Sequence, residues 1–269
     1  ARTFAGVDPV KSPIPVCPAV HYTMGGITCD VHCATPLPGL FAAGECASVG
    51  IHGANRLGSN SLTELLVFGK VAGEQALQFA RQVAAPDTRA LRAQAEAARA
   101  AALALMQRKG PAGSRGERIA TILKEMARSM EEGCGIYRSA ETLQATCTKL
   151  AELKQRLQHI ELDDRSRAWN TEWLTAIELG FLLDVAEAMA HSALHRRESR
   201  GSHQRLDGFE ARDDTNFLKH SLAYCNGQGA PRIDYSAVKI TSSPPGTRAY
   251  GAAGEQAEAE RKAKEKAHV

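Results

Sequence analysis

Apolar residues recur at helical spacing through the middle of the chain. A leucine series at near-heptad spacing comprises Leu143, Leu150, Leu153 and Leu157, and a second series that steps by three and four comprises Leu174, Ile177, Phe181, Val185 and Met189. Such spacing brings apolar side chains onto one face of a helix. We therefore predict antiparallel helices over residues 85–199, packed as a bundle with both series in its core.

A different pattern precedes the predicted bundle. The run "GLFAAGE" at 39–45 is short, apolar and bounded by glycines, which is typical of a buried strand. The polar stretch "HGANRLGSNSL" at 52–62 then leads into an apolar helix that reaches about residue 83. Ser61 and Glu64 fit a capping box at the start of that helix. Residues 1–84 are therefore predicted to form an incomplete α/β lobe.

The pattern changes again after residue 200. The segments "NFLKHSLAYC" and "PRIDYSAVKIT" are typical of two strands, and "NGQG" between them is typical of a turn. Residues 200–250 are thus predicted to form a small region with two strands, and the charged tail at 251–269 is predicted to be disordered. The predicted fold class is an α+β fragment: an incomplete α/β lobe, an antiparallel helical bundle and a small strand-containing C-terminal region.

Composition narrows the functional classes. The net charge is +3, from 33 basic and 30 acidic residues, and this balance argues against a nucleic-acid partner. No apolar run approaches the roughly 20 residues of a membrane-spanning helix, so membrane association would come through a partner. The segment "CDVHC" at 29–33 lacks a second cysteine or histidine pair at metal-binding spacing, and no metal site is predicted.

The polar stretch at 52–62 has the composition of an anion site. A helix that starts near Ser61 presents unpaired amides and a partial positive charge. Gly53 and Gly58 allow the backbone to approach a ligand closely, and Arg56 offers two parallel hydrogen bonds to a carboxylate or phosphate. A polar loop with a surface arginine would contain the same residues, so the stretch alone leaves both interpretations open.

Two further residues favour a site. His21 precedes a glycine pair in "HYTMGG", although a lone histidine is more often structural. Glu45 follows the predicted strand at 39–45, and an acidic residue at the carboxyl end of a strand often binds a ribose or ribityl hydroxyl in nucleotide-binding sheets. Together with Arg56, they suggest a site for a nucleotide-like cofactor and an anion.

Longer motifs resemble the flavoprotein subunits of the fumarate reductase and succinate dehydrogenase family. They are "HYTMGGI", "GLFAAGECASVGIHGANRLGSNSL", "VFGKVAGEQA", "MEEGCGIYR", "ELGFLLDVAEAMAHSAL", "ESRGSHQR", "RDDTNFLKH" and "DYSAVKIT". The resemblance covers nearly the whole chain apart from its tail, and it is to the C-terminal portion of the family. The threonine in "HYTMGG" and the first serine in "NRLGSNSL" favour fumarate reductase over succinate dehydrogenase.

The resemblance implies FAD as cofactor, an FAD-binding role for the α/β lobe, and hydride transfer from the flavin to fumarate in anaerobic respiration. It assigns the substrate carboxylate to His21 and Arg56, and the ribityl chain of the flavin to Glu45. The residues it assigns to the flavin are His21, Tyr22, Glu45, Arg56, Leu57, Gly58, Ser59, Asn60, Ser61 and Leu62. It also places His203 and Arg205 of "ESRGSHQR" near the flavin-bearing lobe, although an ordinary surface turn explains them equally well.

Several parts of the family pattern have no counterpart in this chain: the glycine-rich dinucleotide loop, the histidine that attaches FAD and the arginine that delivers the proton. We therefore expect a fragment, or one piece of a split enzyme, that is inactive without the N-terminal half. The resemblance also implies an iron–sulfur subunit and membrane anchor subunits as partners, at the cytoplasmic face of the inner (plasma) membrane. A succinate dehydrogenase flavoprotein and a non-catalytic helical docking module are the alternatives.

Overall fold

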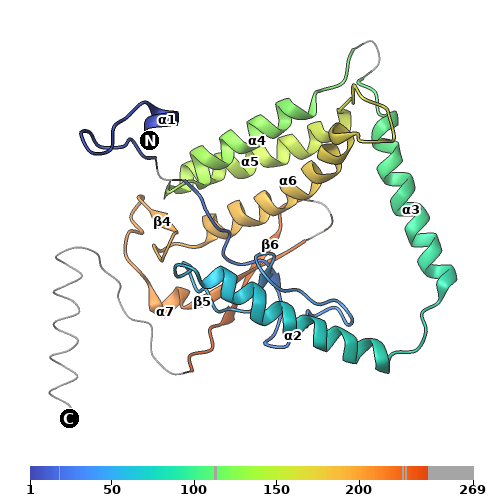
Figure 1. Cartoon of the computed structure of the whole chain (residues 1–269), viewed down its shortest axis with the longest axis horizontal. Helices are drawn as coiled ribbons and strands as arrows, with labels where there is room; N and C mark the ends of the chain where they lie inside the picture. The colour runs from blue at the N-terminus through green and yellow to red at the C-terminus, as the bar shows by residue number, and fades with distance from the viewer. Residues whose placement is uncertain (18, 112–113, 226, 228, 242–269) are drawn as a thin grey trace.

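The computed structural model describes residues 1–241 except 18, 112–113, 226 and 228, so the predicted tail at 251–269 lies outside the described residues. The described part is mainly helical (Figure 1). Its longer helices are α2 (Asn60–Gln82), α3 (Thr88–Gln107), α4 (Ile119–Cys134), α5 (Ala140–Arg156) and α6 (Thr171–His195); α1 (Arg2–Ala5), α7 (Asp214–Phe217) and the 3-10 turn η1 (Leu157–His159) are short. This mixture of helices with few strands confirms the predicted fold class.

Helices α4, α5 and α6 pack against one another and supply most of the core (Figure 1). Leu143, Leu150 and Leu153 of α5 are fully buried, which confirms the core position of these three leucines. Side-chain caps fix where two of the helices begin. The side chain of Asp87 accepts from the amide of Arg89 at the start of α3, and Ser139 forms a capping box at the start of α5.

The second apolar series was predicted to be core, and this prediction is wrong for most of its members. Phe181 of α6 is 66% exposed and Val185 is 55% exposed, whereas Leu179 and Leu183 are fully buried. The physical reason is that α6 is apolar around most of its circumference, so periodicity could not identify the face that packs on α4 and α5. The apolar residues that α6 buries are Ala176, Leu179, Leu183, Ala186, Ala190 and Ala193.

Few strands form before the bundle. β1 (Ile27–Thr28) pairs in parallel with β2 (Ala47–Ser48), and the predicted strand at 39–45 is absent. Its only ladder contact among the described residues is an isolated bridge between Phe41 and Ala34. A strand needs a continuous hydrogen-bonded neighbour, and the segment beside it, residues 33–35, bonds only to Leu40 and Ala42, which is too short for a ladder.

Two more strand pairs tie the C-terminal region together. β3 (Tyr137–Arg138), in the turn between α4 and α5, pairs in parallel with β4 (Gln204–Arg205). β5 (Lys219–Tyr224) and β6 (Arg232–Ala237) form the antiparallel pair that the sequence predicted. The β3–β4 pair and the packing of β5 and β6 against α6 connect this region to the bundle.

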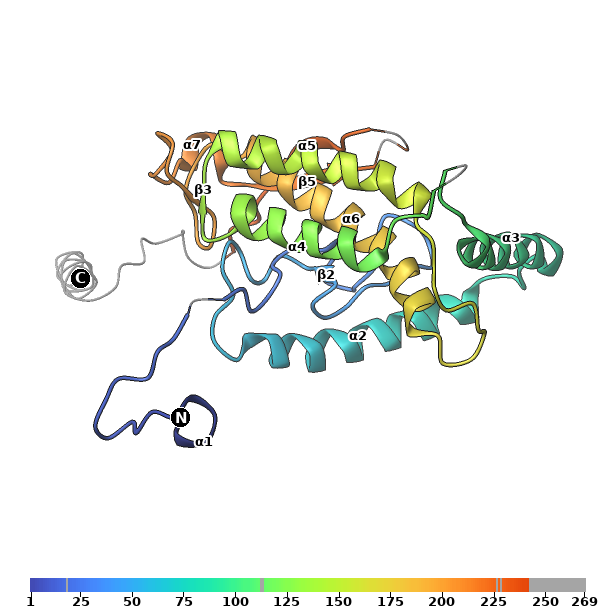
Figure 2. The same cartoon turned by 90° about the horizontal axis from the view of Figure 1, so that it is seen from above.

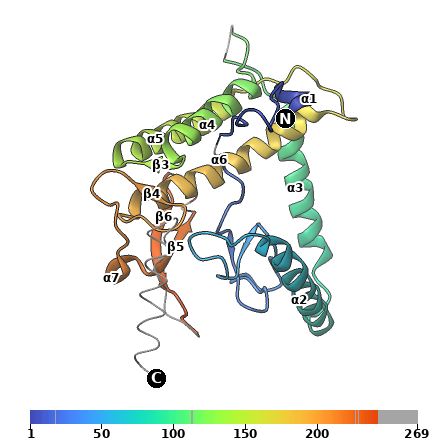
Figure 3. The same cartoon turned by 60° about the vertical axis from the view of Figure 1, so that its left-hand side comes forward.

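The helices α4 and α5 lie on one side of α6, and the lobe that contains α2 lies on its other side (Figures 1 and 3). Figure 2 shows the same helices from above. α3 runs along the edge of the molecule between α2 and the bundle, and the indole N–H of Trp173 donates to the carbonyl of Ala102 at 2.8 Å. None of the helices in the described part is long and apolar enough to cross a bilayer.

Candidate functional site

The helix after the polar stretch starts earlier than predicted. α2 begins at Asn60, and Ser59 is the N-cap residue with a φ of 60°, in the left-handed region. The predicted capping box of Ser61 and Glu64 is wrong, because both residues lie within the helix and no side chain caps its first amides. Glu64 instead turns its carboxylate away from solvent, toward residues of the preceding loops.

A buried polar network fixes the polar stretch. Glu64 is 2% exposed and its Oε2 accepts from the hydroxyl of Tyr22 at 2.9 Å and lies 2.6 Å from Nε2 of His52. The amide of Asn60 lies 3.4 Å from the other ring nitrogen of His52. Burial, followed by the hydrogen bond to Glu64, raises the pKa of Tyr22 to about 12, so this tyrosine stays protonated near neutral pH. The network links "HYTMGG", the polar stretch and α2.

Arg56 stacks on this network and retains an unused donor. Its guanidinium carbon lies 4.7 Å from the centre of the Tyr22 ring, and its Nη1 donates to the carbonyl of Leu57 at 3.0 Å. Its Nε is buried without any partner among the described residues. An unsatisfied buried donor costs about 1–3 kcal/mol, which favours an acceptor bound from outside the chain.

Glu45 reaches the same loop from another segment. Its Oε1 accepts from the amide of Thr23 at 3.1 Å, two residues after His21. Gly26 packs so closely on this segment that a Cβ there would lie 2.4 Å from the carbonyl oxygen of Cys46, and its φ of 138° also favours glycine. The turn of Glu45 and Cys46 is therefore pressed against the "HYTMGG" loop.

The structure thus brings some of the predicted site residues together. Tyr22 and Arg56 are in contact, and Glu45 is bonded to their loop. His21 is exposed one residue before Tyr22, and no hydrogen bond within the described residues joins it to Arg56. The remaining predicted residues border Arg56 and the start of α2, where they are exposed or half-buried: Leu57, Gly58, Ser59, Asn60, Ser61 and Leu62.

Sequence reasoning missed two members of this region and misplaced two others. The sequence pattern assigns no role to His52 of the polar stretch and predicts a cap at Glu64. An ionisable residue at an inward position of an apolar helix is the signal that identifies Glu64 as part of a buried network. His203 and Arg205 are buried rather than projecting from a surface turn. They lie in the C-terminal region, where Arg205 pairs with Asp207 and His203 contacts Arg138.

Comparison with known proteins shows the family of the chain. Residues 1–62 match the FAD binding domain family, and residues 123–250 match the family described as fumarate reductase flavoprotein C-term. The whole chain is 55% identical to the fumarate reductase flavoprotein subunit of Serratia sp. (strain ATCC 39006) and 53% identical to that of Escherichia coli (strain K12). This chain belongs to the fumarate reductase and succinate dehydrogenase flavoprotein family. Both alignments cover 44% of the relative, so the chain spans less than half of the length of these flavoproteins.

Other members place the chain within the family. The succinate dehydrogenase flavoprotein subunit of Coxiella burnetii is 37% identical over 92% of this chain and 43% of that protein. A solved quinol fumarate reductase of Escherichia coli superposes with a TM-score of 0.86 at 54% identity, covering 92% of this chain and 42% of the other. A quinol-fumarate reductase solved with menaquinol gives a TM-score of 0.85. The chain is thus more similar to these fumarate reductases than to this dehydrogenase.

The residues present fit the FAD that the family indicates. The unpartnered Nε of Arg56 and the uncapped first turn of α2 offer donors to anionic groups. Leu57 and Leu62 expose apolar side chains beside these donors, as contact with a flat aromatic ring requires. The space beside Gly58 is open, since a Cβ there would meet nothing within 4 Å.

Proposed function

We propose that this chain is the C-terminal part of the FAD-containing catalytic subunit of a fumarate reductase, which reduces fumarate to succinate. The observation that carries the proposal is Arg56: a guanidinium oriented on the Tyr22 ring, with one buried donor left unpaired beside the segment that fits a flavin. Such an arrangement suits a dicarboxylate held against a flat cofactor. The identities of 53–55% to fumarate reductase flavoproteins support this reaction over succinate oxidation.

The chain's own residues bind and orient the substrate. Arg56 forms two parallel charge-assisted hydrogen bonds with one carboxylate, and His21 adds a donor from the neighbouring loop. Bound FAD supplies the hydride. The Glu64 carboxylate fixes Tyr22 through its hydroxyl and His52 through its ring, so the aromatic face under Arg56 does not move when substrate binds. Glu45 holds a hydroxyl of the cofactor's ribityl chain.

We also propose the family's assembly for this chain. The subunit works with an N-terminal flavoprotein half, an iron–sulfur subunit and membrane anchor subunits, at the cytoplasmic face of the inner membrane. The similarity to solved quinol fumarate reductases supports this assembly. It also predicts that electrons arrive from a quinol rather than from a soluble nicotinamide carrier.

Steady-state kinetics on a complete flavoprotein subunit that contains this chain tests the function. Arg56→Lys loses a bidentate pair in a site that excludes water, which costs roughly 3–5 kcal/mol, or about two to four powers of ten in kcat/KM for fumarate. An ammonium cannot reproduce the planar fork, so lysine does not rescue. His21→Ala removes a single hydrogen bond and costs less.

The flavin content of each variant is the control, measured by absorbance after purification. It stays at the wild-type level in both variants, because Glu45, the start of α2 and the N-terminal half of the subunit still hold the cofactor. A wild-type subunit that contains flavin but does not turn over fumarate contradicts the proposed reaction. Near-normal kcat/KM in Arg56→Lys contradicts the role of Arg56 as the carboxylate clamp.

A further inference from the structure

A turn of the C-terminal region contacts the loop that carries Arg56. Both the amide and the hydroxyl of Ser202 donate to the carbonyl of Ala54, at 3.1 and 3.2 Å. Ala54 lies two residues before Arg56, and 148 residues separate it from Ser202. Two donors from one residue on a single carbonyl fix the position and the orientation of that peptide group.

The contact leaves no room for a side chain at the preceding position. Gly201 has a φ of 59°, and a Cβ there would lie 2.3 Å from the carbonyl oxygen of Ala54 and 2.8 Å from its Cβ. The neighbour in this case is backbone, which cannot swing aside as a flexible side chain can. Any larger residue at 201 must therefore displace the loop at 54–56 or the turn itself.

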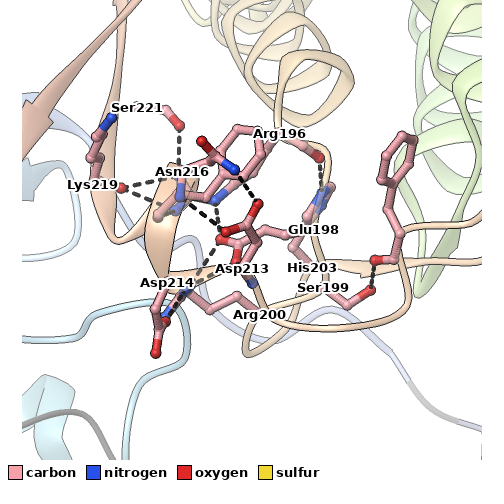
Figure 4. Close-up of polar contacts among 12 residues, drawn as sticks. Arg196, Glu198, Ser199, Arg200, His203, Asp213, Asp214, Asn216, Lys219 and Ser221 are labelled. Atoms are coloured by element: carbon pink, nitrogen blue, oxygen red, sulfur yellow. Dashed lines mark hydrogen bonds and ion pairs between the residues drawn. The ribbon is translucent and has the colours of Figure 1, made fainter.

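A buried ionic cluster makes the turn rigid (Figure 4). Glu198 is 0% exposed, and its carboxylate accepts from Nε of Arg196 at 2.9 Å and from Nε and Nη2 of Arg200 at 2.8 and 2.9 Å. Arg200 also pairs with Asp214 at 2.6 Å, and its backbone exchanges two hydrogen bonds with His203 across the turn. Gly201 and Ser202 lie between the two ends of this bridge, so the cluster sets where they meet Ala54.

The same cluster also fixes a strand that passes near this loop. Arg196 donates to the carbonyl of Lys219 and, at 2.9 Å, to the hydroxyl of Ser221, which holds the start of β5 (Figure 4). His220 lies between them, and a Cβ on Gly50 would lie 3.7 Å from its ring. The loop that carries Arg56 is therefore bonded to the C-terminal region at residue 54 and passes near His220 at residue 50.

We propose that Gly201 and Ser202 are positioning residues for the dicarboxylate site, which they set by fixing the peptide of Ala54 and hence the approach of Arg56. The inference rests on the proposed function. It adds that substrate affinity depends on a turn that lies outside the residues assigned to substrate and flavin and that belongs to the C-terminal region rather than to the lobe. Within the described part of the chain, only the Tyr22 ring and the Leu57 carbonyl orient the guanidinium, so the backbone before it matters.

The test compares two glycine substitutions in a complete flavoprotein subunit that contains this chain. Gly201→Ala places a methyl group against Ala54. Gly208→Ala is the matched control, because Gly208 has a φ of 90° in the same region but a Cβ there would meet nothing within 4 Å. Both carry the strain of a left-handed alanine, so the difference between them isolates the contact. Ser202→Ala is a milder variant that keeps the amide donor and removes only the hydroxyl.

Two measurements are made on each variant. The first is fumarate kinetics at full flavin content: because a misplacement of about 1 Å can cost on the order of 100-fold, kcat/KM falls about 100-fold in Gly201→Ala with most of the change in KM, and stays near wild type in Gly208→Ala. The second is hydrogen–deuterium exchange of peptides covering residues 50–57. It is faster in Gly201→Ala and unchanged in Gly208→Ala. Ser202→Ala also raises KM and the exchange rate at residues 50–57, but by less than Gly201→Ala does.

Each outcome decides the inference. Equal kinetics in Gly201→Ala and Gly208→Ala overturn it, as does faster exchange at 50–57 without any change in KM, since the turn would then be only structural. If Gly201→Ala does not fold, Ser202→Ala decides alone, and wild-type KM with wild-type exchange overturns the proposal. If the wild-type subunit fails to reduce fumarate, the proposed function is wrong, and equal exchange in Gly201→Ala and Gly208→Ala still overturns the coupling of the turn to the loop.

Discussion

Replacing Glu198 by glutamine removes the only carboxylate at the centre of the C-terminal ionic cluster. The carboxylate is fully buried and accepts four hydrogen bonds: one from Arg196, two from Arg200 and one from the amide of Asp213. A glutamine amide can accept on only one of its two terminal atoms. The NH₂ group then faces donors that have lost their acceptor, and the charge that balanced two guanidinium groups is gone.

The loss of stability in Glu198→Gln depends on which partners Arg196 and Arg200 keep. Breaking a buried ion pair by removing one partner costs about 3–5 kcal/mol. Arg200 keeps its pair with Asp214, and Arg196 keeps the carbonyl of Lys219 and the hydroxyl of Ser221, which favours the lower end of that range. A loss of about 3 kcal/mol in a protein of this size lowers Tm by about 6–12 °C.

Thermal unfolding followed by circular dichroism measures this change, with Glu178→Gln as the control. Glu178 is an exposed residue of α6, and a surface substitution of this kind changes stability by no more than about 0.5 kcal/mol. The Glu198→Gln shift persists at high salt, because a pair without solvent contact is screened little. Equal Tm values for Glu198→Gln and Glu178→Gln would refute the reasoning that the cluster depends on this carboxylate.

Two further predictions concern other parts of the fold. Burial, followed by the effect of nearby arginines, lowers the pKa of His203 to about 4. On acidification the unfolded chain therefore takes up a proton at His203 near pH 6.5, whereas the folded protein does not. This contribution to the free energy of unfolding is present in full above pH 6.5, and the free energy falls by up to about 3 kcal/mol as the pH drops to 4. Chemical denaturation across this range checks it, and a pH dependence identical to that of His203→Gln contradicts it. Leu183→Ala at the buried face of α6 lowers the free energy of unfolding by about 2–5 kcal/mol, whereas Leu182→Ala lowers it far less, because Leu182 is 43% exposed. Equal losses for the two variants in unfolding experiments would mean that the buried face of α6 is wrongly assigned.

The sequence predicted those elements whose local pattern admits one interpretation. The leucines of α5 are separated by polar residues, so their buried face was unambiguous, and the cap at Asp87 needed only its own neighbours. α6 could not be oriented from its pattern because it is apolar on several sides. The strand expected at 39–45 depends on a neighbouring strand, and no local pattern shows whether that neighbour is present.

The residues of the candidate site likewise fall into those that the sequence predicts and those for which it carries no local signal. Arg56, Tyr22 and Glu45 were predicted from motifs, and the structure brings them to one loop cluster. The pairing of His52 with Glu64 was missed because it joins a loop to the second turn of a helix, and short-range rules favoured a capping box there. The contact of Ser202 with Ala54 spans 148 residues and has no local signal in the sequence.

The central claim is that Arg56 binds a carboxylate beside the flavin, and equilibrium binding tests it most directly. A complete flavoprotein subunit that contains this chain is titrated with malonate, a dicarboxylate that cannot be reduced, while the flavin absorbance is followed. We expect that Arg56→Lys retains its flavin and raises the Kd for malonate about 100-fold or more, in line with a loss of roughly 3 kcal/mol or more. A Kd in Arg56→Lys equal to that of the wild type, at equal flavin content, would contradict it.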